Sequence, residues 1–209
     1  MWHRLAGRLA SVDADAWNDR YDTSELLWHA EPNQFVRAEL ADLTPGTGLD
    51  LACGEGRNAV WLAGRGWTMT ATDFAARAIE KGEALAREHG VDVTFLVADA
   101  TTYDAGARFD LVLSCYLQLP QPERTEALHR ARDAVAPGGT LLLVAHDRSN
   151  LDGGHGGPQD PGVLPVPDEV VAALDGFVVE RAEVVDRVVD PDEGRRVARD
   201  TLVRARRPD

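Results

Sequence analysis

Short apolar runs alternate with amphipathic stretches between residues 48 and 145. The runs predict five strands, at Gly48–Leu51, Thr68–Thr72, Val93–Val97, Phe109–Ser114 and Thr140–Ala145. Helical patterns separate several of them, at Asn58–Gly64, Ala75–His89 and Pro122–Val135. Strands that alternate with helices of this length indicate a parallel sheet with right-handed crossovers.

The two ends of the chain add further elements. We expect helices near Ala14–Asp22 and Pro32–Leu40, and a short helix at Asp168–Leu174. Phe177–Val188 and Arg196–Arg206 predict two strands, and the turn sequence DPDEG separates them as an antiparallel hairpin. The predicted fold class is therefore α/β: a Rossmann-like, doubly wound, mostly parallel seven-stranded sheet with an antiparallel C-terminal hairpin. We expect a single domain over residues 1–209.

The segment from Asn150 to Pro167 has no periodicity and is rich in glycine and proline. A loop of this length in a compact domain is usually functional or disordered. It follows the fifth predicted strand, at the carboxyl edge of the sheet, where open α/β sheets bind their ligands. We therefore expect residues 150–167 to form a flexible loop that acts as a lid, with plain disorder as the alternative.

Composition narrows the possible partners. A chain of 209 residues with 44% hydrophobic residues is long enough for one full core. The formal charge of −13 opposes binding to nucleic acid and to anionic membranes. No apolar run of about 18 residues and no leader pattern occurs, so we expect a cytoplasmic protein. A single lysine, Lys81, against abundant arginine and alanine is typical of a GC-rich bacterial genome.

The stretch GLDLACGEGRNAVWLA, from Gly48 to Ala63, carries the most chemical information. It predicts a buried strand, a turn with two glycines, and a helix that begins at Asn58 or Ala59. Glycines let the backbone pass close to a ligand. The next strand ends at Asp73, where a carboxylate can accept hydrogen bonds from a ribose diol. This layout predicts a site for a nucleoside-type cofactor.

The segment GEGRNA fits the dinucleotide pattern G-x-G-x-x-G/A, which is a weak signal by itself. Asp50 lies four residues before the first glycine, the third strand ends in another acid, Asp99, and Pro-Gly-Gly precedes a fifth strand. In this combination, the chain from about Leu43 to His146 resembles the class I S-adenosylmethionine (SAM)-dependent methyltransferases. The resemblance implies SAM as cofactor and S-adenosylhomocysteine as product. An NAD-dependent oxidoreductase is the weaker alternative, because Asp50 would face a pyrophosphate and no Tyr-x-x-x-Lys pair occurs.

The same resemblance implies a role for each residue at the strand ends. Asp50 and the Gly54–Gly56 backbone would hold the methionine moiety, Asp73 the ribose and Asp99 the adenine amine. Phe74 would lie against the adenine. The remaining cofactor-binding residues that we predict are Ala52, Asn58, Ala100, Ser114 and Cys115. Each acid alone would more often be a solvated helix cap, but three at successive strand ends favour a cofactor site.

Residues 1–43 are expected to form a helical cap over the cofactor. Within them, WNDRYDTSELLWHAEPNQF resembles the W-(D/N)-x-R-Y…W…P-N signature of tellurite-resistance-type and thiopurine-type small-molecule methyltransferases. This resemblance implies that Trp17, Arg20 and Tyr21 lie near the carboxylate end of the cofactor. The alternative is that these aromatic residues only pack the helix on the core. Trp28 and Asn33 are weaker candidates for the acceptor pocket.

The segment SCYLQLP follows the fourth strand and lacks the N/D-P-P-Y/F turn of amino-methyltransferases. This absence speaks against an N-methylating enzyme that acts on nucleic acid. The N-terminal resemblance implies a small-molecule acceptor, slightly favours a sulfur or other chalcogen nucleophile, and places oxygen next. His146 and Tyr116 are the candidate catalytic residues, since a histidine titrates near neutral pH and can act as a general base. A structural role for His146 is equally open, and a soft nucleophile needs no base. Gln118 and His155 are weaker candidates.

The cysteines and histidines form no metal-binding pattern, and we predict no metal. The sequence also leaves a second class of function open, in which a protein binds SAM without turning it over. It makes no prediction of the oligomeric state.

Overall fold

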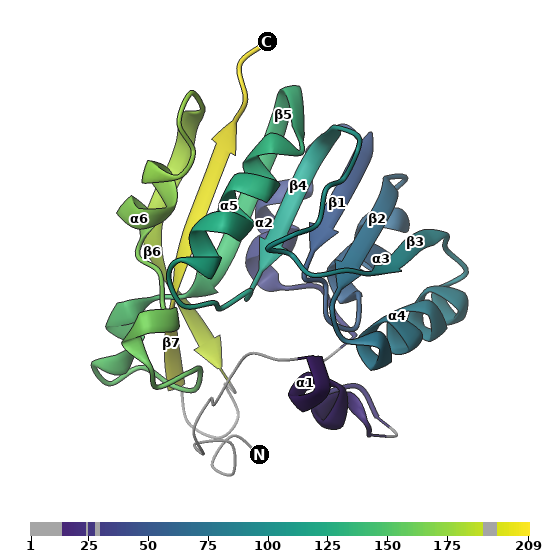
Figure 1. Ribbon diagram of the computed structural model, residues 1–209, viewed down its shortest axis with the longest axis horizontal. Helices are drawn as coiled ribbons and strands as arrows, with labels where there is room; N and C mark the ends of the chain where they lie inside the picture. Colours follow the sequence, from purple (N-terminus) through teal and green to yellow (C-terminus); the bar gives the residue numbers. More distant parts are fainter. Residues whose placement is uncertain (1–13, 24, 28–29, 190–195) are drawn as a thin grey trace.

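The computed structural model describes residues 14–23, 25–27, 30–189 and 196–209. Within them, seven strands form one sheet in the order β3-β2-β1-β4-β5-β7-β6 (Figure 1). The strands are β1 Thr47–Leu51, β2 Thr68–Asp73, β3 Val93–Val97, β4 Phe109–Cys115, β5 Val135–His146, β6 Val178–Val189 and β7 Arg196–Arg206.

The first five strands are parallel, and β7 runs antiparallel to both β5 and β6. This arrangement confirms the predicted fold class, including the C-terminal hairpin. Most boundaries agree with the prediction within two residues, but β5 begins at Val135 and not at Thr140. Val135 pairs with Phe109 before a shift in register around the Pro-Gly-Gly turn, so the preceding helix ends at Asp133.

Helices cover both faces of the sheet (Figure 1). Leu142 and Val144 of β5 belong to the core cluster that packs against α2 and α3, whereas Leu141 and Leu143 belong to the cluster that packs against α5 and α6. This alternation is the two-residue period of a strand that is buried on both faces. The helices are α1 Ala14–Tyr21, α2 Gln34–Leu40, α3 Arg57–Ala63, α4 Ala76–His89, α5 Glu123–Asp133 and α6 Pro167–Ala172.

The glycine-rich segment 150–167 is attached to β7 at several points. The Asn150 side chain accepts a hydrogen bond from the Arg199 amide and donates one to the Gly156 carbonyl, both at 2.8 Å. The His155 amide donates to the Val197 carbonyl at 2.9 Å. A lid role stays a prediction, and any opening of the segment would have to break these bonds.

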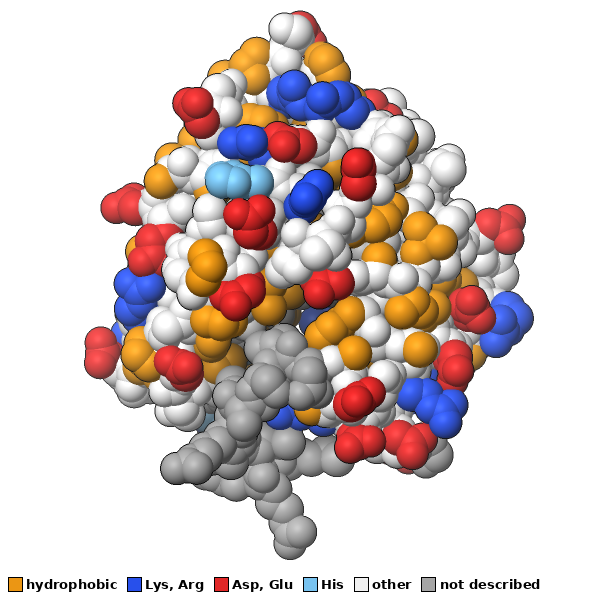
Figure 2. All heavy atoms as spheres, viewed as in Figure 1, with side chains coloured by type: hydrophobic (Ala, Val, Ile, Leu, Met, Phe, Trp, Pro, Cys, Tyr) orange, Lys and Arg blue, Asp and Glu red, His pale blue; other side chains and the backbone are white. Residues whose placement is uncertain are grey.

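Acidic and basic side chains are interspersed on the face of the molecule that Figure 2 shows. Among the described residues, no helix is long and apolar enough to cross a membrane. The same part of the chain holds no group of three or more metal-ligating side chains.

Candidate functional site

The turn after β1 has a backbone that favours glycine. Gly54 and Gly56 have φ angles of 56° and 74°, and Ala52 between strand and turn has a φ of 60°. A Cβ on Gly56 would lie 2.7 Å from a ring carbon of Phe95, so this position has no room for a side chain. The glycines of the sequence motif are therefore needed for both conformation and space.

Asp50 lies on β1, before this turn, and is fully buried. Neither of its carboxylate oxygens has a hydrogen-bond partner among the described residues. Burial, followed by the nearby charge of Asp73, raises the pKa of Asp50 from 3.8 to about 7, although the charge of Arg57 and the backbone amide of Ala59 lower it in part. A buried acid without a partner is a place where a cationic ligand group gains a strong interaction. The residue present here therefore fits the ammonium group of a methionine moiety.

Asp73 connects the end of β2 to the glycine turn. Its Oδ2 accepts a hydrogen bond from the Gly54 amide at 2.9 Å, and its Oδ1 accepts one from the Ala75 amide at 3.0 Å. Burial raises the pKa of Asp73, and these two bonds offset that effect only in part. Each carboxylate oxygen has two lone pairs, so the group retains capacity to accept from a diol.

The next predicted residues occupy the neighbouring strand ends. Phe74 is half-buried and packs in a cluster with Trp17 and Tyr21. Asp99 is exposed, and its Oδ1 accepts hydrogen bonds from the Thr101 amide at 2.8 Å and hydroxyl at 2.7 Å. Ala100 is buried in the core cluster beside α5.

Helix α1 packs against α4 next to the end of β2. The Asn18 side chain accepts a hydrogen bond from the Arg77 amide in the first turn of α4, at 3.0 Å. Trp17 stacks on Tyr21 with ring centroids 5.6 Å apart, and the Arg20 guanidinium lies 4.7 Å from the Trp17 ring centroid. The three predicted residues of the N-terminal signature are thus brought together, whereas Trp28 lies outside the described residues.

Sequence reasoning missed the role of Glu55, the variable residue between the two glycines. Its buried Oε1 accepts hydrogen bonds from the Leu27 amide at 2.9 Å and from Lys81 Nζ at 3.1 Å. Lys81 also donates to the Thr23 hydroxyl and the Glu25 carbonyl. The segment after α1 is therefore bound to the glycine turn, and the only sequence signal was an acid at a position that tolerates any residue.

A second connection joins the same N-terminal segment to β4. The Asn33 amide N–H donates to Asn58 Oδ1 at 2.9 Å, and Asn33 Nδ2 donates to the Tyr116 hydroxyl at 3.2 Å. Asn33 also caps α2. The predicted cofactor residue Asn58 and the predicted acceptor-side residues Asn33 and Tyr116 thus form one hydrogen-bonded chain.

Tyr116 and His146 lie together at the ends of β4 and β5, with ring centroids 4.9 Å apart. Tyr116 has a φ of 63°, which is uncommon for a residue other than glycine. Its hydroxyl donates to Asp200 Oδ2 at 2.7 Å. Burial, followed by the charge of Asp200, raises the pKa of Tyr116 well above its usual range. Tyr116 therefore acts as a donor in this cluster and does not supply a base.

The thiols of Cys53 and Cys115 are weak nucleophiles because both are buried. Burial raises the pKa of Cys53 well above its usual range and that of Cys115 to about 12. Both thiols thus stay protonated near neutral pH.

Ser114 lines a small apolar cavity beside α5. Gln118 Nε2 is buried without a hydrogen-bond partner among the described residues.

Residues 49–139 match the family model described as a methyltransferase domain. The seven-stranded sheet, with its strand order and its antiparallel hairpin, is a Rossmann-like fold that this chain shares with solved methyltransferase structures.

Three known proteins show the range of this similarity. The 2-heptyl-1-hydroxyquinolin-4(1H)-one methyltransferase of Mycobacteroides abscessus is 32% identical over 115 residues, which are 51% of each chain. A structure that concerns the conversion of a disulfide bond into a thioacetal group during echinomycin biosynthesis has a TM-score of 0.74 at 22% identity and covers 93% of this chain and 91% of its own. TehB of Haemophilus influenzae has a TM-score of 0.70 at 16% identity, over 93% of this chain and 66% of its own.

The chain spans about half the length of the first curated relative and a third of the next two. Ribosomal RNA methyltransferases are among these relatives. The exclusion of a nucleic-acid acceptor therefore stays a prediction.

Proposed function

We propose that this chain is a SAM-dependent methyltransferase that acts on a small molecule with an oxygen, sulfur or other chalcogen nucleophile. One observation carries the proposal: the fully buried Asp50 carboxylate has no hydrogen-bond partner in the described structure, beneath a turn whose glycines have left-handed φ angles. A charge in this state costs free energy unless a cation accompanies it. SAM carries an ammonium group, and it supplies a sulfonium methyl for transfer.

The residues around this turn would hold the cofactor along its length. Asp50 would bind the ammonium group, and Asp73 would accept hydrogen bonds from the ribose while it fixes Gly54. Phe74 would lie against the adenine, with Asp99 at the adenine edge. The cluster of Trp17, Arg20 and Tyr21 would close the site from the α1 side, because it packs on Phe74.

The acceptor would bind at the ends of β4 and β5, next to His146. Two observations favour a small acceptor: the net charge of −13 repels polyphosphates, and the segment after β4 lacks the turn of amino-methyltransferases. The relatives named above that modify a hydroxyquinolinone or a disulfide bond are consistent with an oxygen or sulfur acceptor. Positioning of two reactants supplies most of the acceleration in such a displacement.

Calorimetry with SAM, S-adenosylhomocysteine and NAD tests the cofactor. We expect both sulfur compounds to bind and NAD not to bind. Asp50→Asn should weaken SAM binding more than tenfold, whereas Asp92→Asn, an exposed acid before β3, should not change it.

A screen with radiolabelled SAM against phenols, N-hydroxyquinolones and thiols then tests the activity. Transfer to any of them supports the proposal. Tight SAM binding without transfer would favour the alternative of a protein that binds SAM but does not turn it over. NAD binding without SAM binding would refute both.

A further inference from the structure

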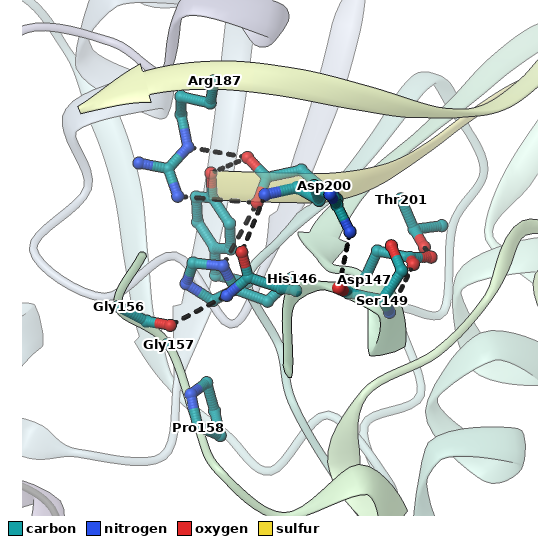
Figure 3. A network of polar contacts seen from close by, with 12 residues as sticks. His146, Asp147, Ser149, Gly156, Gly157, Pro158, Arg187, Asp200 and Thr201 are labelled. Atoms are coloured by element: carbon teal, nitrogen blue, oxygen red, sulfur yellow. Dashed lines mark hydrogen bonds and ion pairs between the residues drawn. The ribbon is translucent and has the colours of Figure 1, made fainter. Parts of the chain in front are cut away.

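Asp200 is a fully buried acid on β7 that lies at the centre of a polar cluster (Figure 3). Its Oδ2 accepts hydrogen bonds from the Tyr116 hydroxyl and from Arg187 Nε, each at 2.7 Å. Its Oδ1 lies 3.1 Å from His146 Nδ1. Sequence reasoning missed both Asp200 and Arg187, although it identified the two residues that they contact.

The sheet register explains why these groups meet. His146 of β5 and Asp200 of β7 are directly paired across the antiparallel ladder. On the other side of β7, Asp200 pairs with Val185 of β6, which places Arg187 on the diagonal. Direct and diagonal neighbours on one face are within reach of each other's side chains. The strands β5, β7 and β6 therefore bring together an imidazole (His146), a carboxylate (Asp200) and a guanidinium (Arg187).

The imidazole of His146 is confined by three neighbours: the Asp200 carboxylate, the Tyr116 ring and the backbone at Gly157. The Tyr116 ring lies against it, and the backbone at Gly157 is so close that a Cβ there would lie 2.9 Å from the imidazole ring. The Nδ1–Oδ1 contact is short, although the ring is not aligned for a full hydrogen bond. Such contacts commonly tighten when the substrate binds. Nε2 has no hydrogen-bond partner among the described residues, and His146 keeps a small exposed fraction of 6%.

The charges of the cluster favour an ionised Asp200. Burial raises the pKa of this carboxyl, but the contacts with His146 and Arg187 outweigh burial and hold the pKa below its usual range. The adjacent acid, Asp147, points elsewhere, because its carboxylate accepts from the Ser149 amide and the Thr201 hydroxyl. Asp200 is thus the acid in contact with the imidazole, and Arg187 is paired with that acid.

We propose that Asp200 is the positioning residue that turns His146 into a general base for a neutral hydroxyl or thiol acceptor. The carboxylate holds the proton on Nδ1 and leaves the Nε2 lone pair free for the acceptor. Arg187 keeps the carboxylate of Asp200 ionised beside the imidazole of His146. This inference rests on the proposed function, and it narrows the acceptor to one that still carries its proton when it binds.

The chemical balance is simple. The O–H or S–H bond of the acceptor breaks, its proton moves to His146 Nε2, and the electron pair stays on the acceptor atom. That pair forms the new bond to the methyl carbon, and the carbon–sulfur bond breaks with its electrons on sulfur. The imidazolium that remains lies beside Asp200 until solvent takes the proton.

The test is an NMR titration of the His146 ring in the full chain, with and without S-adenosylhomocysteine. His146→Gln assigns the signal by its loss. Asp200→Asn removes the negative charge next to the imidazolium, so the midpoint should move to lower pH. Arg187→Met removes the positive charge, so the midpoint should move to higher pH. Asp147→Asn, an equally buried acid one residue from His146, is the matched control and should move it clearly less.

Shifts of opposite sign in Asp200→Asn and Arg187→Met support the proposal, since loss of packing alone would not produce them. Shifts of the same sign, or a shift in Asp147→Asn as large as in Asp200→Asn, would overturn it. The titration needs no acceptor and no transfer, so its failure is distinct from failure of the proposed function. With any acceptor from the screen, Asp200→Asn should lower kcat by roughly 10²–10⁴ with an unchanged Kd for SAM.

Discussion

Replacement of Asp50 by asparagine should stabilise the free protein and at the same time weaken its binding of SAM. Asparagine has almost the same shape as aspartate but no charge. The carboxylate of Asp50 is fully buried and has no hydrogen-bond partner in the described structure, so it destabilises the fold whenever it is ionised. The same charge is what a bound ammonium group would use.

The magnitude follows from the pKa. In the folded protein the pKa of this carboxyl is about 7, compared with 3.8 for an aspartate in water. At about 1.4 kcal/mol per pH unit, the difference corresponds to about 4 kcal/mol above pH 7. The folded state binds more protons than the unfolded state between these two values. The free energy of unfolding should therefore fall as the pH rises from 4 to 7, and then level off.

The variant lacks this dependence, because asparagine does not titrate. At pH 5, wild-type Asp50 is protonated in the fold but already ionised in the unfolded chain, so Asp50→Asn should be more stable by roughly 1.5–2 kcal/mol. At pH 8, the advantage of Asp50→Asn should be larger. We expect the difference between the two proteins to change by roughly 2–3 kcal/mol from pH 5 to pH 8.

Urea denaturation of both proteins at pH 5, 6, 7 and 8 measures this change. Asp92→Asn is the control for the loss of an exposed acid, and its stability should stay parallel to wild type. Saturating SAM should reduce the advantage of the variant at pH 8 by about 1.4 kcal/mol for each tenfold loss of affinity, because the ligand stabilises each protein according to its affinity. A variant that is less stable than wild type at pH 8 without ligand would refute the reasoning, since it would show that the carboxylate is satisfied in the fold.

Three further predictions concern neighbouring parts of the site. Asp73→Ala should weaken SAM binding by roughly 1.5–3 kcal/mol in calorimetry, and unchanged affinity in a folded variant would remove Asp73 from the site. Proteolysis should cut residues 150–167 more slowly with S-adenosylhomocysteine and acceptor than without them if the segment is a lid, and equal rates would speak against one. His146→Ala should lower turnover by about 10²–10⁴ with unchanged SAM affinity, and a loss below tenfold would show that the acceptor needs no base.

The sequence predicted which residues meet at the ends of the parallel strands, but it did not predict the buried charges of the hairpin. Asp50, Gly54 and Asp73 follow from local pattern, because residues at the ends of adjacent parallel strands meet at one edge of the sheet. The meeting of Tyr116 and His146 follows in the same way, since β4 and β5 are neighbours. These predictions needed only the order of the strands, which alternation of strand and helix makes predictable.

Asp200 and Arg187 could not be found in this way. Their strands carry many charged residues in alternation, a pattern that resembles a solvated hairpin. Which of those charges points inward depends on the register of β7 against β5, and a slip by one residue would turn Asp200 to the other face of the sheet. That register is fixed by the packing of Leu202 and Val203 into the two core layers, which becomes visible only in three dimensions.

The energetic cost of the cluster supports a chemical role for it. A buried ion pair is a weak stabiliser, and apolar residues of similar size often replace one without loss of stability. Asp200 is fully buried, its partner Arg187 is largely buried, and the site adds a non-glycine residue with positive φ at Tyr116. Charge burial and backbone strain that coincide at the carboxyl edge of the sheet contribute little to folding. They are consistent with the proposed role of Asp200 in positioning His146.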